Sequence, residues 1–352
     1  MPLSHQINRR FKTALFAWFA IHAVVNAQQA QIPFAGVALE GCPIRAEQLS
    51  DAARDIGVKP EIIVFFVQWP EKYEAGKRYF PGETFDLIWQ SGAVPCLTWE
   101  PMLIQAGQEK AVLVGDILSG RYDDYLMAFA RQSVRWPHPF IIRFAHEMNL
   151  DRYHWGTEKK DYGPQSPAIY REIFTYIVRF FRICGADNTI WCFCPNVDSV
   201  PDTGKDPQNN WNTVDKYYPG DDIIDLLGLD GYNFTATGVA DPGRSFKSIF
   251  TRPVQCLQTI APRKPLLVFE TASPRSSGDR RPWLQDMLLS AQLWNLKGFV
   301  WFQVKKEMDW RLLEGELGSI LGVPMPKNRA QEWINRLYYE KKRSIGKNSE
   351  RD

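Results

Sequence analysis

Two glutamates follow strongly apolar segments and are the side chains best placed for chemistry. Glu147 follows Ile141-Ile-Arg-Phe-Ala-His146, and Glu270 follows Leu266-Leu-Val-Phe269. A carboxylate in such surroundings is costly unless it is hydrogen-bonded or functional, and either one alone could be a structural ion-pair residue. Two carboxyl groups that face one bond are what glycoside hydrolysis requires. The pair therefore indicates a carbohydrate-active site.

The two glutamates belong to a series of eight apolar segments of strand length, separated by intervals of helix length. Continuous hydrophobicity is typical of strands that are buried on both faces, as in a parallel sheet covered by helices. Eight such units predict an α/β fold, a single TIM (β/α)8 barrel, which suits a chain of 352 residues. The predicted strands are residues 32–41, 62–69, 93–101, 139–149, 188–196, 225–233, 264–273 and 298–306.

Reactive groups of this fold lie at the C-terminal ends of the strands, and there carboxylates, amides and aromatic residues predominate. Such side chains suit hydrogen bonds to sugar hydroxyl groups and stacking on sugar rings. No phosphate-binding glycine loop, dinucleotide fingerprint or lysine context for pyridoxal phosphate is present in the sequence. The sequence therefore excludes phosphoryl transfer and redox chemistry, and we expect no cofactor.

The histidines and cysteines do not form a metal-ligand pattern. Beyond residue 27 only His138, His146 and His154 remain, too scattered for a histidine-rich catalytic metal. Cys192 and Cys194 lack the spacing and the second pair of a zinc site. We expect no metal and buried thiols, although an exported protein could also form disulfides.

The segment from Arg143 to Asn149, followed by Tyr153 and Trp155-Gly156, resembles glycoside hydrolase family 26. This family consists of clan A barrels that include β-1,4-mannanases, mixed-linkage glucanases and some xylanases. The resemblance spans residues 32–335 and continues, in the family's order, in Trp99-Glu100-Pro101, Tyr217 to Asp222, Gly228 to Asn233, Phe269-Glu270-Thr271 and Trp301-Phe302.

The resemblance implies a retaining double displacement in which Glu147 is the general acid/base and Glu270 the nucleophile. The two carboxyl groups would then lie about 5 to 5.5 Å apart. In the resting enzyme Glu147 would be protonated and Glu270 ionised, because the reaction needs one acid and one carboxylate. Tyr232 resembles the tyrosine that donates a hydrogen bond to the nucleophile, with a rim aromatic as the alternative.

Two neighbours of Glu147 are candidates for supporting roles. Strict alternation along a strand points His146 away from the face that carries Glu147, so a functional His146 requires an irregularity at that strand end. Arg143 shares the parity of Glu147 and should point inward. Its charge must be paired there and would lower the pKa of a neighbouring carboxylate.

Other strand-end residues are candidates for sugar binding. Trp155 and Trp301 are expected to be platforms for sugar rings, with core packing as the alternative. Weaker candidates for binding hydroxyl groups are Asn149, Trp99, Glu100 and Asn196.

The substrate is less sharply defined than the reaction. The resemblance favours an endo-β-1,4-mannanase, but Leu150 to His154 replaces the sequence that commonly follows His-Glu-Met-Asn in the family's mannanases. A mixed-linkage β-1,3-1,4-glucanase or an exopolysaccharide-processing glucanase therefore stays open. A catalytically silent polysaccharide-binding barrel is the second alternative, and the intact Glu147, Glu270 and Tyr232 speak against it.

The ends of the chain differ from its body. Arg9, Arg10 and Lys12 precede an apolar run at 13–25 and a small-residue cleavage site that ends at Ala27. This pattern predicts a signal peptide over 1–27 and a secreted or periplasmic protein. We expect the catalytic barrel over 28–339 and a charged, disordered tail over 340–352.

The net charge of the chain limits the classes of partner that we expect. The formal net charge is +2, from 42 basic and 40 acidic side chains, which leaves no electrostatic footprint for nucleic acid. No segment after the predicted signal is apolar and long enough to cross a membrane. We expect a monomer whose partner is a β-linked polysaccharide.

Overall fold

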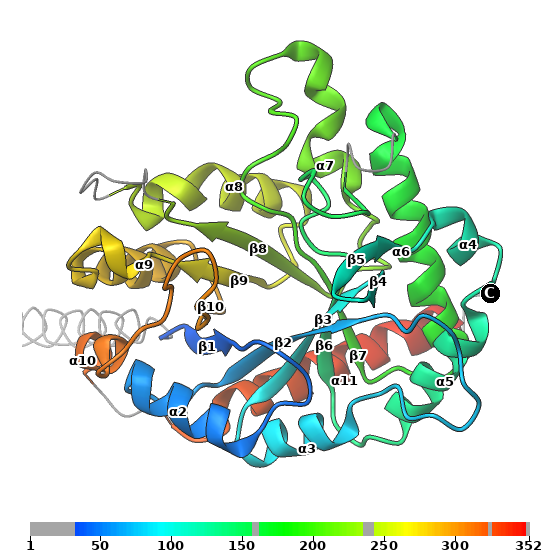
Figure 1. Ribbon diagram of the computed structural model, residues 1–352, viewed down its shortest axis with the longest axis horizontal. Helices are drawn as coiled ribbons and strands as arrows, with labels where there is room; N and C mark the ends of the chain where they lie inside the picture. The colour runs from blue at the N-terminus through cyan, green and yellow to red at the C-terminus, as the bar shows by residue number, and fades with distance from the viewer. Residues whose placement is uncertain (1–31, 157–161, 235–242, 323–325, 350–352) are drawn as a thin grey trace, which may run out of the picture. The chain divides into compact units, whose positions relative to one another are not determined.

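Eight parallel strands close into a barrel in the computed structural model, which describes residues 32–156, 162–234, 243–322 and 326–349 (Figure 1). Strand β10 pairs in parallel with β1 and thereby completes the ring. The strands are β1 (Phe34–Ala38), β2 (Ile62–Gln68), β3 (Val94–Glu100), β6 (Phe140–Phe144), β7 (Thr189–Phe193), β8 (Leu226–Tyr232), β9 (Leu266–Ala272) and β10 (Gly298–Phe302). The predicted TIM (β/α)8 barrel is confirmed.

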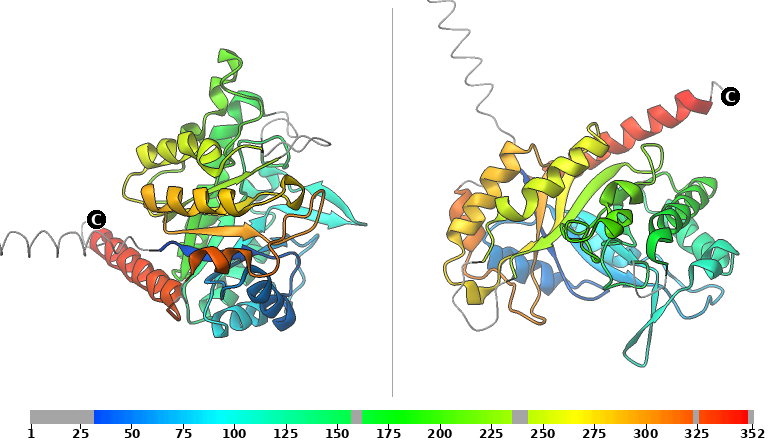
Figure 2. Two further views of the ribbon diagram at one scale, coloured as in Figure 1. Left: turned by 90° about the vertical axis from the view of Figure 1, so that its left-hand side faces the viewer. Right: turned by 90° about the horizontal axis from the view of Figure 1, so that it is seen from above.

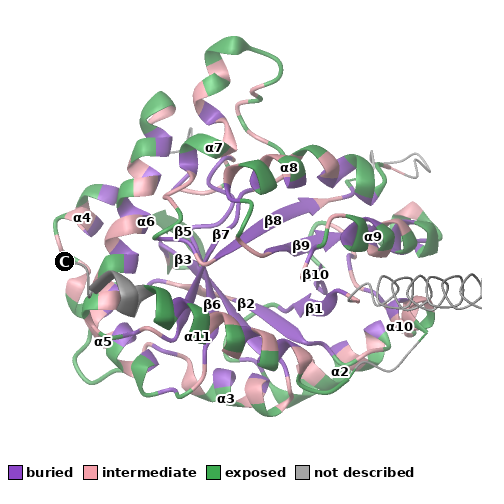
Figure 3. Ribbon diagram, turned by 180° about the vertical axis from the view of Figure 1, so that it is seen from behind, coloured by how far each residue is buried: buried purple, intermediate pink, exposed green. Residues whose placement is uncertain are grey.

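A layer of helices surrounds the barrel, so that each strand is buried on both faces. Every residue of β1, β3, β6, β7, β9 and β10 is buried, whereas exposed residues gather on the outer sides of the helices (Figure 3). This arrangement explains why the strand segments are apolar throughout. The outer helices are α2 (Ala46–Ile56), α3 (Gly82–Gln90), α4 (Val114–Leu118), α5 (Asp123–Val134), α6 (Ser166–Ile183), α7 (Val214–Tyr217), α8 (Phe246–Ile260), α9 (Arg281–Leu293) and α10 (Glu316–Leu321).

A β-hairpin that the sequence analysis did not predict follows β3. Its strands β4 (Met102–Gln105) and β5 (Gln108–Ala111) are antiparallel. Ala106 and Gly107 form the turn with positive φ angles of 49° and 75°, as two-residue hairpin turns of the type I′ class require. Every residue of β5 is exposed. The hairpin therefore lacks the buried face by which strands are found in a sequence.

The predicted disordered tail over 340–352 was wrong for most of its length. Helix α11 (Arg329–Ser349) runs across the N-terminal ends of the barrel strands (red in Figures 1 and 2). Trp333 packs on Phe34 at the start of β1, with 5.3 Å between the ring centroids. The Lys341 amine donates to the carbonyl oxygen of Thr189, the first residue of β7, at 2.6 Å. One side of this highly charged helix is thus anchored, which composition alone does not reveal.

Two further predictions concern the start of the chain and the state of the cysteines. The predicted signal peptide at 1–27 lies outside the described residues, and from Phe34 onward the chain forms one compact unit. All six cysteines are free thiols, and Cys96, Cys192 and Cys194 are buried as expected. Within the described ranges, no helix has both the length and the apolar character needed to span a bilayer.

Replacing Lys341 with methionine is expected to destabilise the barrel. The Lys341 amine lies 2.8 Å from a carboxylate oxygen of Asp225, and both side chains are almost fully buried. Removing one partner of such a pair costs roughly 3 to 5 kcal/mol of unfolding free energy. Urea unfolding followed by tryptophan fluorescence measures the change. Lys342→Met, at the exposed neighbouring position, is the control, and equal midpoints for the two variants would contradict the role of Lys341.

Candidate active site

A cleft of about 1030 Å³ lies at the C-terminal ends of the barrel strands, where active sites of this fold are built. Both candidate catalytic glutamates, Glu147 and Glu270, line it. Other lining residues come from the strand ends, from the loops that follow them and from the β4–β5 hairpin. Among them are Gln68, Glu100, Ile104, Glu109, Arg152, Tyr153, Asn196, Tyr232 and Phe302.

The backbone becomes irregular between β6 and Glu147. Ala145 and Glu147 have positive φ angles of 48° and 51°, a region that side-chain-bearing residues rarely adopt. The Glu147 amide still donates to the carbonyl of Cys194 at 2.8 Å. Because alternation is interrupted, His146 is also directed toward the site, and its Nε2 lies 4.0 Å from a carboxylate oxygen of Glu270. This is the irregularity that a functional His146 requires.

Glu147 is a buried carboxyl group with a raised pKa. It is 6% exposed, and Asn196 Nδ2 donates a hydrogen bond of 2.6 Å to its Oε1. Burial and, next, the negative charge of Glu270 raise the pKa of Glu147 to about 7. A large fraction of Glu147 is therefore protonated at neutral pH, which is the state that a general acid needs.

Glu270, on β9, is held by two donors from other strands, Arg143 on β6 and Tyr232 on the adjacent β8. Arg143 Nη1 donates to its Oε1 at 2.9 Å, and the Tyr232 hydroxyl donates to its Oε2 at 2.5 Å. The expected hydrogen bond from Tyr232 to Glu270 is thus present. These contacts orient the carboxylate toward the cleft, so Glu147 and Glu270 have different surroundings suited to different roles.

The Arg143 side chain lies at the centre of the site and is fully buried. It forms an ion pair with Asp230 as well as with Glu270 and donates to the Thr98 hydroxyl at 2.9 Å. Burial opposes its charge, but the carboxylates of Asp230 and Glu270 outweigh burial and raise the pKa of Arg143 well above its ordinary value. Arg143 in turn acts to lower the pKa of Glu147, as expected.

Asp230 is a site residue that the sequence analysis did not single out. It lies two residues before Tyr232, near the C-terminal end of β8. A carboxylate at a strand end is the signal by which it could have been found. One side-chain N or O atom from each of His146, Asp230 and Glu270 lies within 4.8 Å of the other two, a spacing at which the three atoms could coordinate a metal ion. The guanidinium of Arg143 already contacts both carboxylates, however, and supplies the positive charge that they need.

His146 is buried and held in its neutral form. Burial and the positive charge of Arg143 lower the pKa of His146 well below its ordinary value. Its Nε2 lies 3.1 Å from the Tyr153 hydroxyl, so a hydrogen bond joins the two side chains. Tyr153 lines the cleft. His146 therefore holds the hydroxyl of this tyrosine and itself lies between Tyr153 and Glu270.

The model of glycosyl hydrolase family 26 matches residues 121–256, which include Glu147, Asn196, Asp230 and Tyr232. Endoglucanase H of Acetivibrio thermocellus is 29% identical over 73% of this chain and 26% of its own length. The chain is therefore related to glycoside hydrolase family 26. A mannan endo-1,4-β-mannosidase of Bacillus subtilis is 29% identical over 26% of this chain and 23% of its own length. The chain thus spans about a quarter of each of these curated relatives.

Solved structures show the same fold for this chain. A family 26 β-mannanase from Bacteroides ovatus superposes with a TM-score of 0.56 and 17% identity. The match covers 88% of this chain and 89% of that one.

The three tryptophans predicted to contact sugars lie in the core and not along the cleft, which corrects those predictions. Trp99 and Trp301 are fully buried, and Trp155 is 3% exposed. Trp301 packs edge-on against Trp283 of α9, so its side of β10 faces the helix layer. Trp99 likewise stacks on Phe129 of α5. Alternation along the strands decides this: Phe302, one residue after Trp301, lines the cleft instead.

Each of these buried indoles donates its N–H within the fold. The Trp99 N–H binds the Tyr125 hydroxyl at 2.9 Å, and that of Trp301 binds the Trp310 carbonyl at 2.8 Å. Trp155 donates to the His146 carbonyl at 2.6 Å and stacks on Tyr153, with 4.6 Å between the ring centroids. Trp155 thus supports Tyr153, the aromatic residue that lines the cleft.

The predicted polar residues divide into two groups. Asn149 is buried away from the cleft, and its Nδ2 donates to the carbonyls of Asn196 and Asp198 at 2.9 and 2.6 Å. It therefore shapes the loop that brings Asn196 to Glu147. Glu100 does line the cleft and accepts a hydrogen bond from Gln68, and burial raises the pKa of Glu100 to about 7.

Replacing Tyr232 with phenylalanine is expected to lower kcat by roughly 10- to 100-fold with little change in stability. The variant removes the hydroxyl that holds the carboxylate of Glu270 but keeps the ring and its packing on Phe302. A hydrogen bond to a charged group contributes about 1.5 to 3 kcal/mol. Steady-state kinetics on a soluble polysaccharide substrate measure the effect, and wild-type kcat would contradict the role.

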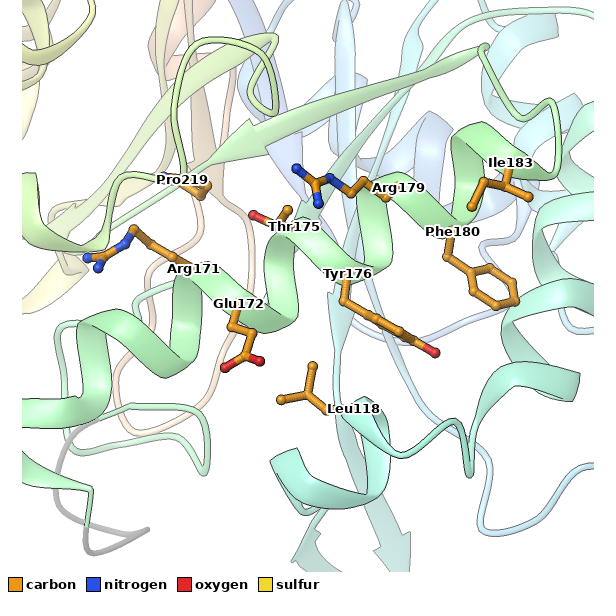
Figure 4. Close-up of a pocket in the computed structure, with 9 residues that line it drawn as sticks. All are labelled: Leu118, Arg171, Glu172, Thr175, Tyr176, Arg179, Phe180, Ile183 and Pro219. Carbon is orange, nitrogen blue, oxygen red and sulfur yellow. The ribbon is translucent and has the colours of Figure 1, made fainter.

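A second pocket, of about 580 Å³, lies along the outer side of α6, between that helix and Leu118 of α4 (Figure 4). Among the described residues that line it, Glu172 is the one carboxylate, and Arg171 and Arg179 are the cations. Glycoside hydrolysis needs two carboxyl groups. The outer pocket therefore does not offer a second site for that chemistry.

Proposed function

We propose that this chain is a retaining endo-β-glycanase that hydrolyses β-1,4-linked polysaccharide. The observation that carries the proposal is the difference between two carboxyl groups in one cleft. Glu147 has a pKa raised to about 7, whereas Glu270 accepts hydrogen bonds from Arg143 and Tyr232. This division supplies an acid and a nucleophile at the same pH.

In the proposed reaction Glu270 attacks the anomeric carbon while Glu147 transfers its proton to the leaving oxygen. A covalent glycosyl-enzyme forms on Glu270 and the leaving chain departs. Glu147, now ionised, takes a proton from water, and the water attacks the anomeric carbon and releases Glu270. Asn196 keeps Glu147 in place through both steps, and Arg143 and Tyr232 do the same for Glu270. We expect a carboxyl separation of about 5 to 5.5 Å.

For the substrate we propose that β-glucan is preferred to mannan. The match to an endoglucanase extends over 73% of this chain, whereas the match to the Bacillus mannosidase extends over 26%. The segment that departs from the mannanase pattern, residues 150–154, also contributes Leu150, Arg152 and Tyr153 to the cleft. Mannan, which the sequence motifs favour, is the second candidate. The export-signal pattern at 1–27 supports action outside the cytoplasm.

Product analysis on mixed-linkage glucan, glucomannan, galactomannan and xylan tests the proposal, with Glu270→Ala as the inactive control. Oligosaccharides from mixed-linkage glucan that are absent in the control are expected. NMR of the first products should show the β-anomer, as retention requires. If galactomannan alone is cleaved, mannan replaces β-glucan as the proposed substrate and the proposed mechanism is unchanged. Binding without cleavage of any polymer would instead favour the silent barrel.

A further inference from the structure

The β4–β5 hairpin forms one wall of the cleft. Met102, Ile104 and Glu109 all line it, and Ile104 and Glu109 lie directly opposite each other on the two strands. Ile104 is 50% exposed, although it is a large apolar residue. An exposed aliphatic side chain that faces a cleft offers a surface for the apolar face of a sugar ring.

The hairpin is anchored at its base but needs support farther out. The Met102 carbonyl accepts from the Trp69 amide at 2.9 Å, and Met102 is buried. All four residues of β5, by contrast, are exposed. A two-stranded hairpin is by itself marginally stable in water. Its position over the cleft therefore depends on contacts that its side chains make with the barrel.

One such contact joins the hairpin to the loop that follows Glu147. Both guanidinium Nη atoms of Arg152 donate to the carboxylate of Glu109, at 2.8 and 2.7 Å. The guanidinium also lies over the ring of Tyr153, 4.8 Å from its centroid. Bidentate pairs fix geometry as well as distance. The pair thus sets the spacing between Ile104 on one wall and Tyr153 on the other.

We propose that the β4–β5 hairpin is a binding wall for the sugar units next to the scissile bond, and that the Glu109–Arg152 ion pair holds it against the Glu147 loop. This inference rests on the proposed function, which supplies a polysaccharide as the ligand. Ile104 and Tyr153 contact the sugar rings, and Glu109 and Arg152 are positioning residues. The pair is partly exposed, at 34% and 49%, so it contributes little to global stability.

Affinity electrophoresis through mixed-linkage glucan tests the inference without relying on turnover. Glu109→Gln, Arg152→Lys and the double variant are compared in a Glu270→Ala background. Each single variant is expected to bind about tenfold more weakly, and the double variant no more weakly than that, because all three lose the same bidentate pair. Asp279→Asn removes another exposed pair, to Arg281, that is not part of the cleft, and should bind as the parent does.

Three results would overturn the inference. The first is that Glu109→Gln and Arg152→Lys bind as tightly as Asp279→Asn does. The second is that their effects multiply to about a hundredfold in the double variant, as expected for residues that act separately. Ile104→Asn, which leaves the ion pair intact, should also weaken binding, and parental affinity for this variant would exclude the hairpin as a binding wall. If the Glu270→Ala parent binds mixed-linkage glucan but the protein with an intact Glu270 cleaves none, the proposed function is wrong. The inference that the hairpin is a binding wall is then retained.

Discussion

Replacement of Glu270 by alanine is expected to reduce kcat on β-glucan by roughly 10⁶-fold, the scale seen when a nucleophile that acts within a catalytic unit is removed. The carboxylate is fixed by Arg143 and Tyr232, and neither donor can attack carbon in its place. Reducing-sugar release measures the loss. Thermal unfolding should show that the variant is folded.

Azide provides an internal control for the nucleophile variant. With an activated aryl β-glycoside, azide can enter the space left by Glu270 and attack the anomeric carbon from that face. The expected product is the α-glycosyl azide, because a retaining enzyme forms its covalent bond on the α face of a β-glycoside. A β-glycosyl azide, or a variant with more than about one hundredth of wild-type kcat, would show that Glu270 is not the nucleophile.

Replacement of Glu147 by glutamine is expected to lower kcat on polysaccharide by about 10² to 10⁴-fold, the range for a general acid/base. Aryl glycosides with good leaving groups need less protonation and should lose less. Activity of the wild type should fall as pH rises through about 7, because ionisation of Glu147 removes the acid. Glu100→Gln is the comparison, because the pKa of Glu100 is also raised to about 7. This variant should retain the alkaline limb.

The same substitution has an opposite effect on stability at alkaline pH. Folding raises the pKa of Glu147 from its ordinary value of 4.5 to about 7. The stability that the neutral carboxyl contributes is therefore complete below pH 4.5 and is lost as pH rises through about 7. Because glutamine stays neutral, Glu147→Gln should gain about 1 to 3 kcal/mol over wild type between pH 4.5 and pH 8. A constant difference in unfolding free energy across this range would contradict the raised pKa.

The contrast between activity and stability follows from the same two features, burial and the nearby charge of Glu270. Both disfavour a negative charge on Glu147. The acid is kept protonated for the first chemical step, and the fold tolerates a carboxyl group that is least stable when ionised. A loss of folding stability in exchange for activity is common where the pKa of a side chain is shifted for catalysis.

The sequence by itself determined the barrel, its eight strands and the main polar residues of the site. Long apolar segments leave few alternatives to a buried parallel sheet, and a parallel barrel brings all C-terminal strand ends to one side. Glu147, Glu270, Tyr232 and Arg143 meet there, although Arg143 and Glu270 are 127 residues apart. The family motifs lie at the same strand ends, so the resemblance and the residue pattern point to one site.

Only the tertiary structure decided which side chains face the cleft and how the outlying segments attach. Trp301 turns to the helices and Phe302 to the cleft because neighbouring residues of a strand face opposite sides. The positive φ angle of Glu147 breaks that rule and cannot be read from the residue type. The exposed strand β5 of the hairpin and α11 are attached to the barrel through Glu109–Arg152 and Lys341–Asp225. Such long-range pairs leave no periodic pattern in a sequence, because each depends on which surfaces the folded chain brings together.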